Sequence, residues 1–136
     1  MNRLKQRGGF TLLEIIIVII IIGVLASLAL PRFFKTVEFS RATEALTHLS
    51  NIRQSMNRCY LPENSYTKCT DFPFIDVENP GTLPGSHFTY AIGGVDATHF
   101  TVTATRNATD NGDGLSTISI NEAGVKSGTL VFGSIH

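Results

Sequence analysis

The chain has 136 residues, about the length of one domain, and its 11 basic and 11 acidic side chains balance to a net charge of +0. This balance excludes a strong overall attraction to nucleic acid or to an acidic substrate. One apolar run takes up about twenty residues, so the part left to form a soluble core is small.

The N-terminal segment is basic and leads into that apolar run. Arg3, Lys5 and Arg7 precede a stretch from residue 10 to residue 30 in which Glu14 is the one charged side chain. A secretory signal peptide also has a basic start, but its apolar stretch is only about 7–15 residues long and ends at a small-residue cleavage site. The run here is longer, and the Pro-Arg-Phe sequence that follows it is a poor cleavage site.

A membrane anchor is the second interpretation of this run. About twenty apolar residues in a helix span ~30 Å, which is the thickness of the hydrocarbon core of a bilayer. Because basic residues that flank a membrane helix stay in the cytoplasm, the N-terminus is predicted to be cytoplasmic and the rest of the chain to lie outside. This interpretation explains the whole segment except Glu14.

Glu14 is unusual because it lies about one turn into an apolar helix. A carboxylate there is expected to cost a few kcal/mol if it behaves as Asp does on the membrane-insertion scale. The apolar run contains no Lys, Arg or His that could pair with it. Its partner must therefore come from another chain or from a charge that processing creates.

The residues around Glu14 suggest a third interpretation. Gly9, the sequence Phe-Thr-Leu-Leu-Glu from Phe10 to Glu14, and the apolar run after it resemble the signals of the prepilin class, found in type IV pilins, type II secretion pseudopilins and competence pilins. The resemblance implies that a prepilin peptidase cuts between Gly9 and Phe10, releases residues 1–9 as a leader, and methylates the new amine of Phe10. The cut would place an ammonium one helical turn from Glu14, where opposite charges attract strongly in a low dielectric.

The resemblance also implies roles along residues 10–31, the transmembrane and assembly helix. The Glu14 carboxylate would engage the N-terminal amine of a neighbouring subunit and set the register between the two. Gly23 and Pro31 both weaken a helix, and in the family the helix between such positions can loosen inside a filament. The alternative is the ordinary tolerance of membrane helices for glycine and proline.

Residues 32–61 are predicted to continue the helix with one apolar stripe. The residues of this stripe recur at steps of three or four: Ala42, Ala45, Leu46, Leu49, Ile52, Met56 and Cys59. Leu61-Pro62 is expected to stop the helix. A continuous helix from residue 10 to residue 60 would be ~75 Å long, and its first half would need lipid or other helices around it. This length is a physical argument for polymerisation that does not depend on the resemblance.

Residues 62–136 are predicted to form a loop region and an antiparallel sheet. The stretch 62–86 is rich in turn residues and is expected to be a surface loop. Strand patterns follow at 88–92, 99–105 and 116–120, with a hairpin turn at 121–124 and a short last strand at 130–132. The predicted fold is α+β, with a long helix packed on a sheet of three or four strands, and the resemblance implies the ladle-like shape of pilins.

Cys59 and Cys69 are the two cysteines of the chain. In an exported protein a pair at this spacing is typical of a disulfide, whereas two free thiols are the alternative. A bridge that closes a loop of about ten residues would stabilise the fold by roughly 2–3 kcal/mol.

Other candidate sites are weaker. Asp110 and Asp113 lie in an Asn-Gly-rich stretch that matches a calcium loop poorly, so no metal is expected beyond this weak candidate. Three basic residues are predicted to be exposed on the head, namely Lys68, Arg106 and Lys126, which is too few to favour nucleic acid as a partner. No catalytic motif or cofactor motif stands out, so the chain is expected to be a substrate of an enzyme and not an enzyme.

The leading hypothesis is a structural subunit of a type IV pilus that serves adhesion, motility or DNA uptake. A pseudopilin of a type II secretion system is the alternative. The expected partners are further copies of the chain, prepilin peptidase, the inner-membrane assembly platform, and membrane lipid before assembly. The chain is expected to cross the cytoplasmic membrane once and then to leave it for an extracellular filament.

Overall fold

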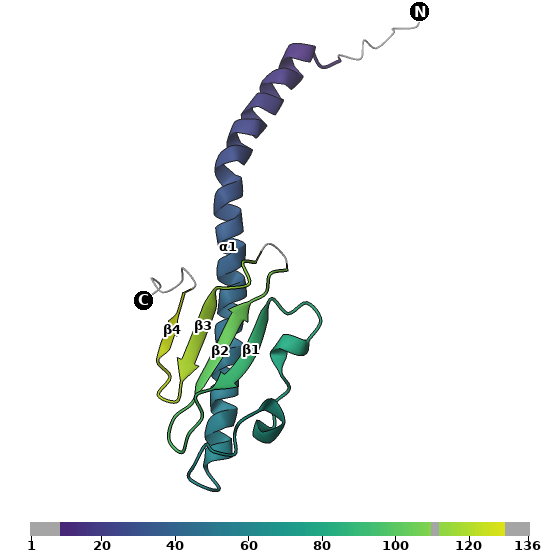
Figure 1. Cartoon of the computed structure of the whole chain (residues 1–136). Helices are drawn as coiled ribbons and strands as arrows, with labels where there is room; N and C mark the ends of the chain where they lie inside the picture. Colours follow the sequence, from purple (N-terminus) through teal and green to yellow (C-terminus); the bar gives the residue numbers. More distant parts are fainter. Residues whose placement is uncertain (1–8, 110–111, 130–136) are drawn as a thin grey trace, which may run out of the picture. The chain divides into compact units, whose positions relative to one another are not determined.

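The computed structural model of the chain describes residues 9–109 and 112–129. Within those residues the chain forms one long helix, α1 (Leu12–Tyr60), and a four-stranded sheet (Figure 1). The strands follow one another in the sequence: β1 (Phe88–Gly93), β2 (Thr101–Arg106), β3 (Thr117–Asn121) and β4 (Lys126–Gly128). The chain divides into two compact units, Met1–Glu38 and Phe39–His136, and the boundary falls inside α1.

Helix α1 begins where Thr11 caps it. The Thr11 hydroxyl accepts a hydrogen bond from the backbone N–H of Glu14 at 3.3 Å, and the Thr11 carbonyl accepts one from the N–H of Ile15 at 3.3 Å. A threonine at this position satisfies a donor that the first helical turn leaves without an intrahelical acceptor. The helix ends at Tyr60, just before Leu61-Pro62, as the sequence predicts.

In the first unit, α1 is exposed along nearly its whole length. Every residue from 9 to 36 is exposed, and the helix passes through Pro31 without ending. The aliphatic side chains of this segment therefore find no cover within the unit. The weakening of the helix at Gly23 and Pro31 stays a prediction.

In the second unit, the sheet is an antiparallel meander in the order β1-β2-β3-β4. This arrangement confirms the α+β prediction of a helix followed by three or four antiparallel strands. Tyr90 pairs with Ala104, which pairs with Ile118, so buried residues stand opposite one another across the sheet. The last strand is Lys126–Gly128, whereas the predicted strand at 130–132 lies outside the described residues.

The core of the second unit lies between the sheet and the later part of α1. Its helical members confirm the predicted stripe: Ala42, Ala45, Leu49, Ile52 and Met56 are buried. The strands contribute Phe88, Tyr90, Val102, Ala104, Ile118 and Ile120, and Phe100 lies just before β2. These residues form one hydrophobic cluster, because the strands alternate buried and outward-facing side chains against a single helical face.

The segment between helix and sheet was wrongly predicted to be a surface loop throughout. Tyr66, Phe72 and Ile75 are buried in the core, and Phe72–Ile75 and Pro80–Thr82 form 3-10 turns. The turns have local causes: the Asp71 side chain accepts a hydrogen bond from the N–H of Phe72 at 2.8 Å, and Pro80 begins the second turn with its φ already restricted. Capped turns let isolated apolar residues reach the core without any period in the sequence.

The predicted disulfide between Cys59 and Cys69 is present, and it joins the last turn of α1 to this segment across 10 residues of sequence. Cys69 is fully buried, and its N–H donates to the Tyr66 carbonyl at 2.7 Å. The bridge therefore fixes the chain where it leaves the helix and places Tyr66 against the ring of Phe100, with centroids 4.8 Å apart.

Replacing Cys59 and Cys69 together with serine is expected to lower the free energy of unfolding by about 2–3 kcal/mol, since the unfolded chain regains the loop entropy that the bridge removes. Thermal unfolding of the full chain in detergent measures the change, and reduced wild-type protein should unfold at the same lowered temperature. An unchanged midpoint in both samples would show that the bridge contributes nothing to stability.

The prediction that Arg106 is exposed is wrong. Its side chain is buried, with only 2% of its surface exposed. It lies on the buried face of β2, and its Nη1 donates to the carbonyl of His87 at 3.0 Å and to that of Thr109 at 3.4 Å. The guanidinium carbon also lies 5.8 Å from the centre of the Phe88 ring. A buried arginine is tolerated because these carbonyls and the ring replace the water it loses.

Arg106→Met keeps the apolar stem and removes the guanidinium hydrogen bonds, while the carbonyls of His87 and Thr109 keep their backbone donors, the N–H groups of Asn107 and Gly112. We therefore expect the free energy of unfolding to fall by about 0.5–1.5 kcal/mol. Hydrogen exchange should quicken at the N–H of Asn107, which donates to the His87 carbonyl at 3.0 Å. Lys126→Met is the matched control: it removes an exposed cation from β4 and is expected to change stability by less than about 0.5 kcal/mol. Equal stability of the two variants would contradict this role of Arg106.

Candidate functional site

The candidate cleavage site lies in non-helical chain just before α1. Gly9 and Phe10 precede the helix and are both exposed, and the Phe10 side chain keeps 82% of its surface open. A peptidase needs its scissile bond accessible and outside regular hydrogen bonding. The described geometry of this segment meets that requirement without any unfolding of α1.

Neither of the two predicted glycines is required by the packing of the chain itself. A Cβ atom added at Gly9 or at Gly23 would meet nothing within 4 Å. Neither position has the positive φ that would favour glycine for its backbone conformation. If these glycines matter, the constraint must come from another molecule.

Glu14 lies exposed in the first turn of α1, where its own N–H bonds to Thr11. The part of the chain that the structure describes places no cation within ion-pair distance of its carboxylate. Sequence reasoning missed the Thr11 cap, although Thr-Leu-Leu-Glu has the spacing of a capping box, Ser/Thr-x-x-Glu/Gln, and could have revealed it. The partial positive charge of the helix N-terminus favours an acid in the first turn, but it does not explain an acid at membrane depth.

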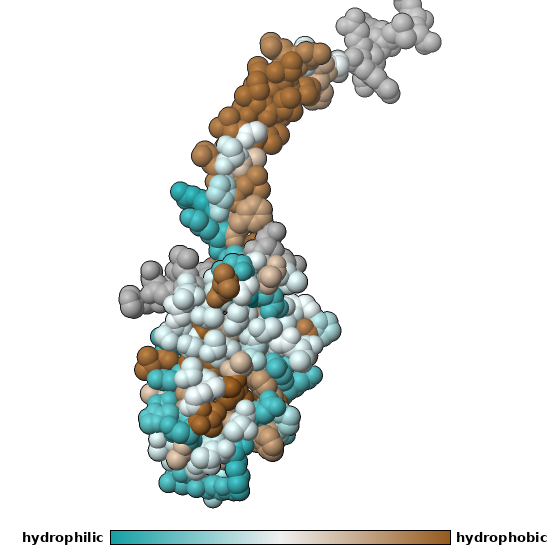
Figure 2. Space-filling view, viewed as in Figure 1, coloured by the Kyte–Doolittle hydropathy of each residue, from teal (hydrophilic) through white to brown (hydrophobic). Residues whose placement is uncertain are grey.

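The surface around Glu14 consists mostly of exposed aliphatic side chains. Helix α1 contains a stretch long and apolar enough to cross a membrane, and none of that stretch is buried within the described residues. Figure 2 shows this hydrophobic surface in brown at the N-terminal end of the helix. Exposed apolar area of this extent marks a surface that lipid or other protein covers.

Comparison with known proteins places this arrangement in a family. Residues 31–117, more than half of the chain, match the family described as "Type IV minor pilin ComP, DNA uptake sequence receptor". The chain belongs to this family of type IV minor pilins. Residues 4–30 of the pilin also match the "Prokaryotic N-terminal methylation motif". Gly9, Phe10 and Glu14 lie within this matched stretch.

Individual relatives agree with this assignment. The pilin is 41% identical over 56 residues to a probable minor fimbrial protein of Dichelobacter nodosus, a match that covers 41% of this chain and 35% of that protein. It is 31% identical over 71 residues to the type II secretion system core protein G of Vibrio cholerae, which covers 52% of this chain and 48% of that protein. The chain thus spans about a third to a half of the length of these relatives.

A solved structure shares the fold. The crystal structure of the non-core minor pilin PilV of Neisseria meningitidis aligns with a TM-score of 0.54 over 66% of this chain and 84% of that one. At 22% sequence identity the likeness concerns the fold alone.

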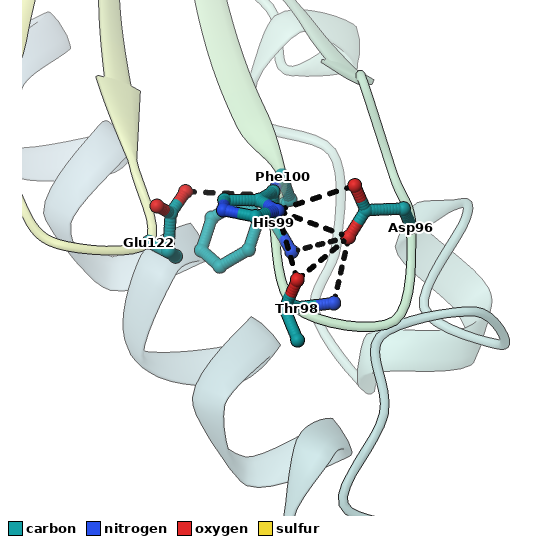
Figure 3. Close-up of polar contacts among 5 residues, drawn as sticks. All are labelled: Asp96, Thr98, His99, Phe100 and Glu122. Atoms are coloured by element: carbon teal, nitrogen blue, oxygen red, sulfur yellow. Dashed lines mark hydrogen bonds and ion pairs between the residues drawn. The ribbon is translucent and has the colours of Figure 1, made fainter.

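One polar cluster of the pilin has the residue types of a catalytic relay but not its geometry. Asp96, Thr98 and His99 lie in the turn between β1 and β2 (Figure 3). The Thr98 hydroxyl lies 2.8 Å, and an Asp96 oxygen 3.2 Å, from the same ring nitrogen, Nδ1 of His99. A relay needs one group on each ring nitrogen, so this imidazole cannot pass a proton from one to the other.

The Asp96 carboxylate instead organises the turn. Its Oδ1 accepts hydrogen bonds from the backbone N–H groups of Thr98 and His99, each at 2.7 Å. These two bonds, helped by the His99 ring, lower the pKa of Asp96 to about 2. Nearby, the Glu122 carboxylate accepts from the N–H of Phe100 at 3.5 Å, which links this turn to the one between β3 and β4.

The weak calcium candidate is only partly described, since Asp110 lies outside the described residues. The Asp113 carboxylate accepts hydrogen bonds from the Ser116 hydroxyl and from the backbone N–H groups of Ser116 and Leu115. The Ser116 contacts come first among the causes that lower the pKa of Asp113 to about 2. Within the described residues, no group of three metal-ligating side chains gathers anywhere.

Proposed function

We propose that this pilin is a structural subunit of a type IV pilus and that it polymerises through α1. The observation that carries the proposal is the fully exposed apolar segment of α1 with Glu14 near its start. Lipid can cover the aliphatic side chains but not a carboxylate, which costs a few kcal/mol in hydrocarbon. A bundle of identical helices covers both, provided that each subunit brings a cation to the Glu14 of its neighbour.

Processing would supply that cation. We propose that a prepilin peptidase cuts between Gly9 and Phe10, that residues 1–9 leave as a leader, and that the new Phe10 amine is methylated. The exposed, non-helical position of this bond supports the proposal, as does the match to the methylation motif. A methylated amine keeps its positive charge, so it can still pair with a carboxylate.

The proposed route runs from the cytoplasmic membrane to a filament. Residues 10–31 would hold the subunit in lipid with its N-terminus in the cytoplasm, and residues 32–61 and 62–136 would lie outside. An inner-membrane assembly platform would then transfer the subunit from lipid to the growing polymer. Covering each apolar helix with its neighbours would offset the loss of lipid contact.

A pseudopilin of a type II secretion system is the second candidate, and the similarity to core protein G favours it. That similarity spans only 52% of the chain. The match to the minor pilin family instead covers residues 31–117, which include β1, β2 and the disulfide. This wider match is the reason for placing the pilus first.

The family description also names a receptor for a DNA uptake sequence. DNA binding depends on cations that lie free to meet phosphates. Residues 39–136 carry nine acidic and six basic side chains, Arg106 is buried, and the Lys68 ammonium is paired with Glu63. We therefore propose a structural role for this subunit, with nucleic acid not its principal ligand.

Intact-mass measurement of the native protein tests the proposal. Filaments sheared from cells should yield a chain that begins at methylated Phe10 and carries the oxidised pair Cys59–Cys69. The same processed mass found only in the membrane fraction would favour a pseudopilin. An uncut N-terminus in both fractions would overturn the proposal.

A further inference from the structure

Two exposed cations follow directly after the apolar run of α1. Arg32 and Lys35 both lie in the first unit, and residues 15–31 before them carry no charge. They are three residues apart in one helix, so their side chains lie on the same side of it. Figure 2 shows hydrophilic residues in teal beyond the brown apolar segment of the helix. We call Arg32 and Lys35 the basic pair.

The charges of the basic pair are not neutralised by the chain itself. Within the described residues, neither member takes part in an ion pair. The same helical turn exposes two aromatic rings: Phe33 keeps 61% and Phe34 keeps 58% of its surface open, and the ring centroids lie 6.1 Å apart. Cations beside exposed rings suit a boundary between hydrocarbon and headgroups, where the rings meet acyl chains and the charged ends reach polar groups.

The length of the helix places the basic pair at that boundary. From the Cα of Glu14 to the Cα of Arg32 the helix rises ~27 Å, slightly less than the ~30 Å of a bilayer's hydrocarbon core. Moving the helix outward would bury the Glu14 carboxylate, and the cost of doing so holds Arg32 close to the outer edge of the hydrocarbon. Lys35 lies ~5 Å further along, still within a headgroup layer that is roughly 5–8 Å thick.

The direction of the side chains adds to this placement. Long side chains on a helix point back towards its N-terminus, which here is the direction of the membrane. The guanidinium of Arg32 is therefore expected to lie no further from the hydrocarbon than its own backbone does. At this depth the groups that surround an isolated subunit on every side are lipid headgroups and their phosphates.

The chemistry of the pair fits a phosphate. Cations that flank a membrane helix are usually kept on the cytoplasmic side, so two of them at the outer end are more than a plain anchor requires. A guanidinium can donate two parallel hydrogen bonds to one phosphate, and an ammonium beside it adds a second positive charge. We propose that the basic pair binds the phosphate of an anionic phospholipid in the outer leaflet of the cytoplasmic membrane. This inference rests on the membrane insertion proposed above.

The test uses a fluorescent probe beside the basic pair. The chain contains no tryptophan, so Phe33→Trp in the full chain introduces a single one. The protein is reconstituted in phosphatidylcholine vesicles with a minority of phosphatidylglycerol, and either lipid carries bromine near the top of its acyl chains. Bromine quenches tryptophan only at contact. Brominated phosphatidylglycerol should quench roughly fivefold more than its share of the lipid at low salt, since one cation near an anionic surface contributes a factor of about five, and less at high salt.

Arg32→Gln/Lys35→Gln, made in the probe-bearing chain, should reduce this preference to the bulk ratio of the two lipids. The matched control is Lys68→Gln/Lys126→Gln, which removes two exposed cations from the second unit and should keep the preference. Circular dichroism checks that α1 forms in both variants; if the double variant does not fold, Lys35→Gln alone is the test and should lower the preference severalfold.

The outcomes separate this inference from the proposed membrane insertion. A probe that neither lipid quenches would show that residue 33 does not reach the membrane boundary, which would overturn both. Quenching without a preference for phosphatidylglycerol, or an equal preference in the Arg32→Gln/Lys35→Gln variant, would overturn only the lipid site. Quenching that follows the protein-to-lipid ratio and not the identity of the brominated lipid would assign the basic pair to a second copy of the chain, and it would also overturn the lipid site.

Discussion

Glu14→Gln is expected to abolish filament assembly while leaving cleavage at Gly9 intact. The substitution removes the carboxylate charge and keeps the size of the side chain. If the pairing with a neighbouring amine offsets a cost of about 2–3 kcal/mol, the loss weakens each subunit contact by roughly 30- to 140-fold. Because glutamine serves in a capping box as well as glutamate does, the start of α1 at Thr11 should be unaffected.

The measurement compares sheared filaments with membranes, and intact mass reports whether each pool is processed. Glu44→Gln is the matched control, since it neutralises an exposed acid on the same helix beyond the apolar run. We expect the Glu14 variant to accumulate as a processed chain in the membrane and the Glu44 variant to assemble normally. Normal filaments made of Glu14→Gln would refute the assigned role.

Gly9→Val is expected to block processing and, as a result, assembly. A side chain at residue 9 meets nothing within this protein, so the variant should fold and insert as before. The valine side chain would instead displace the scissile bond in the active site of the peptidase, and a small displacement there can slow a reaction by roughly 10²-fold. Intact mass should show the chain with its leader retained, confined to the membrane fraction.

Gly23→Ala is the control for that experiment, because it changes a glycine of the same apolar helix that also has open space around it. It should be cut at the normal rate. A mature mass for Gly9→Val equal to that of wild type would place the cleavage site elsewhere.

Strong periodic signals made much of this fold predictable. The apolar stripe of α1 and the alternation in β1, β2 and β3 each repeat one local rule over many residues, and the structure bears them out. The start of α1 at Thr11 was also within reach, since its cap has a short sequence signature. Glu14 could be identified as a functional residue for a different reason. It is a charged residue in an apolar run that offers no partner for it, so its presence indicates a contact with another group.

The parts that were missed depend on tertiary contacts. Phe72 and Ile75 reach the core from 3-10 turns, whose single buried residues show no period. The alternation in β2 puts Arg106 on the buried face, but an arginine is not expected there until the carbonyl of His87 and the ring of Phe88 are known to surround it. Sequence alone gave no reason to bring residues 87 and 106 together.

The cap at Thr11 has a consequence for the timing of assembly. Thr11 lies on the product side of the proposed cut, so α1 keeps its own start after the leader has gone. A helix N-terminus carries a partial positive charge of about half an elementary charge, and the new amine of Phe10 would add a full one beside it. In an uncut subunit the nitrogen of Phe10 is part of a neutral peptide bond, so the N-terminus of α1 carries only the partial positive charge of the helix. Proteolysis would therefore control when a subunit can assemble. Only a cut chain has the ammonium that pairs with the Glu14 carboxylate of another subunit, so uncut chains would not enter the polymer.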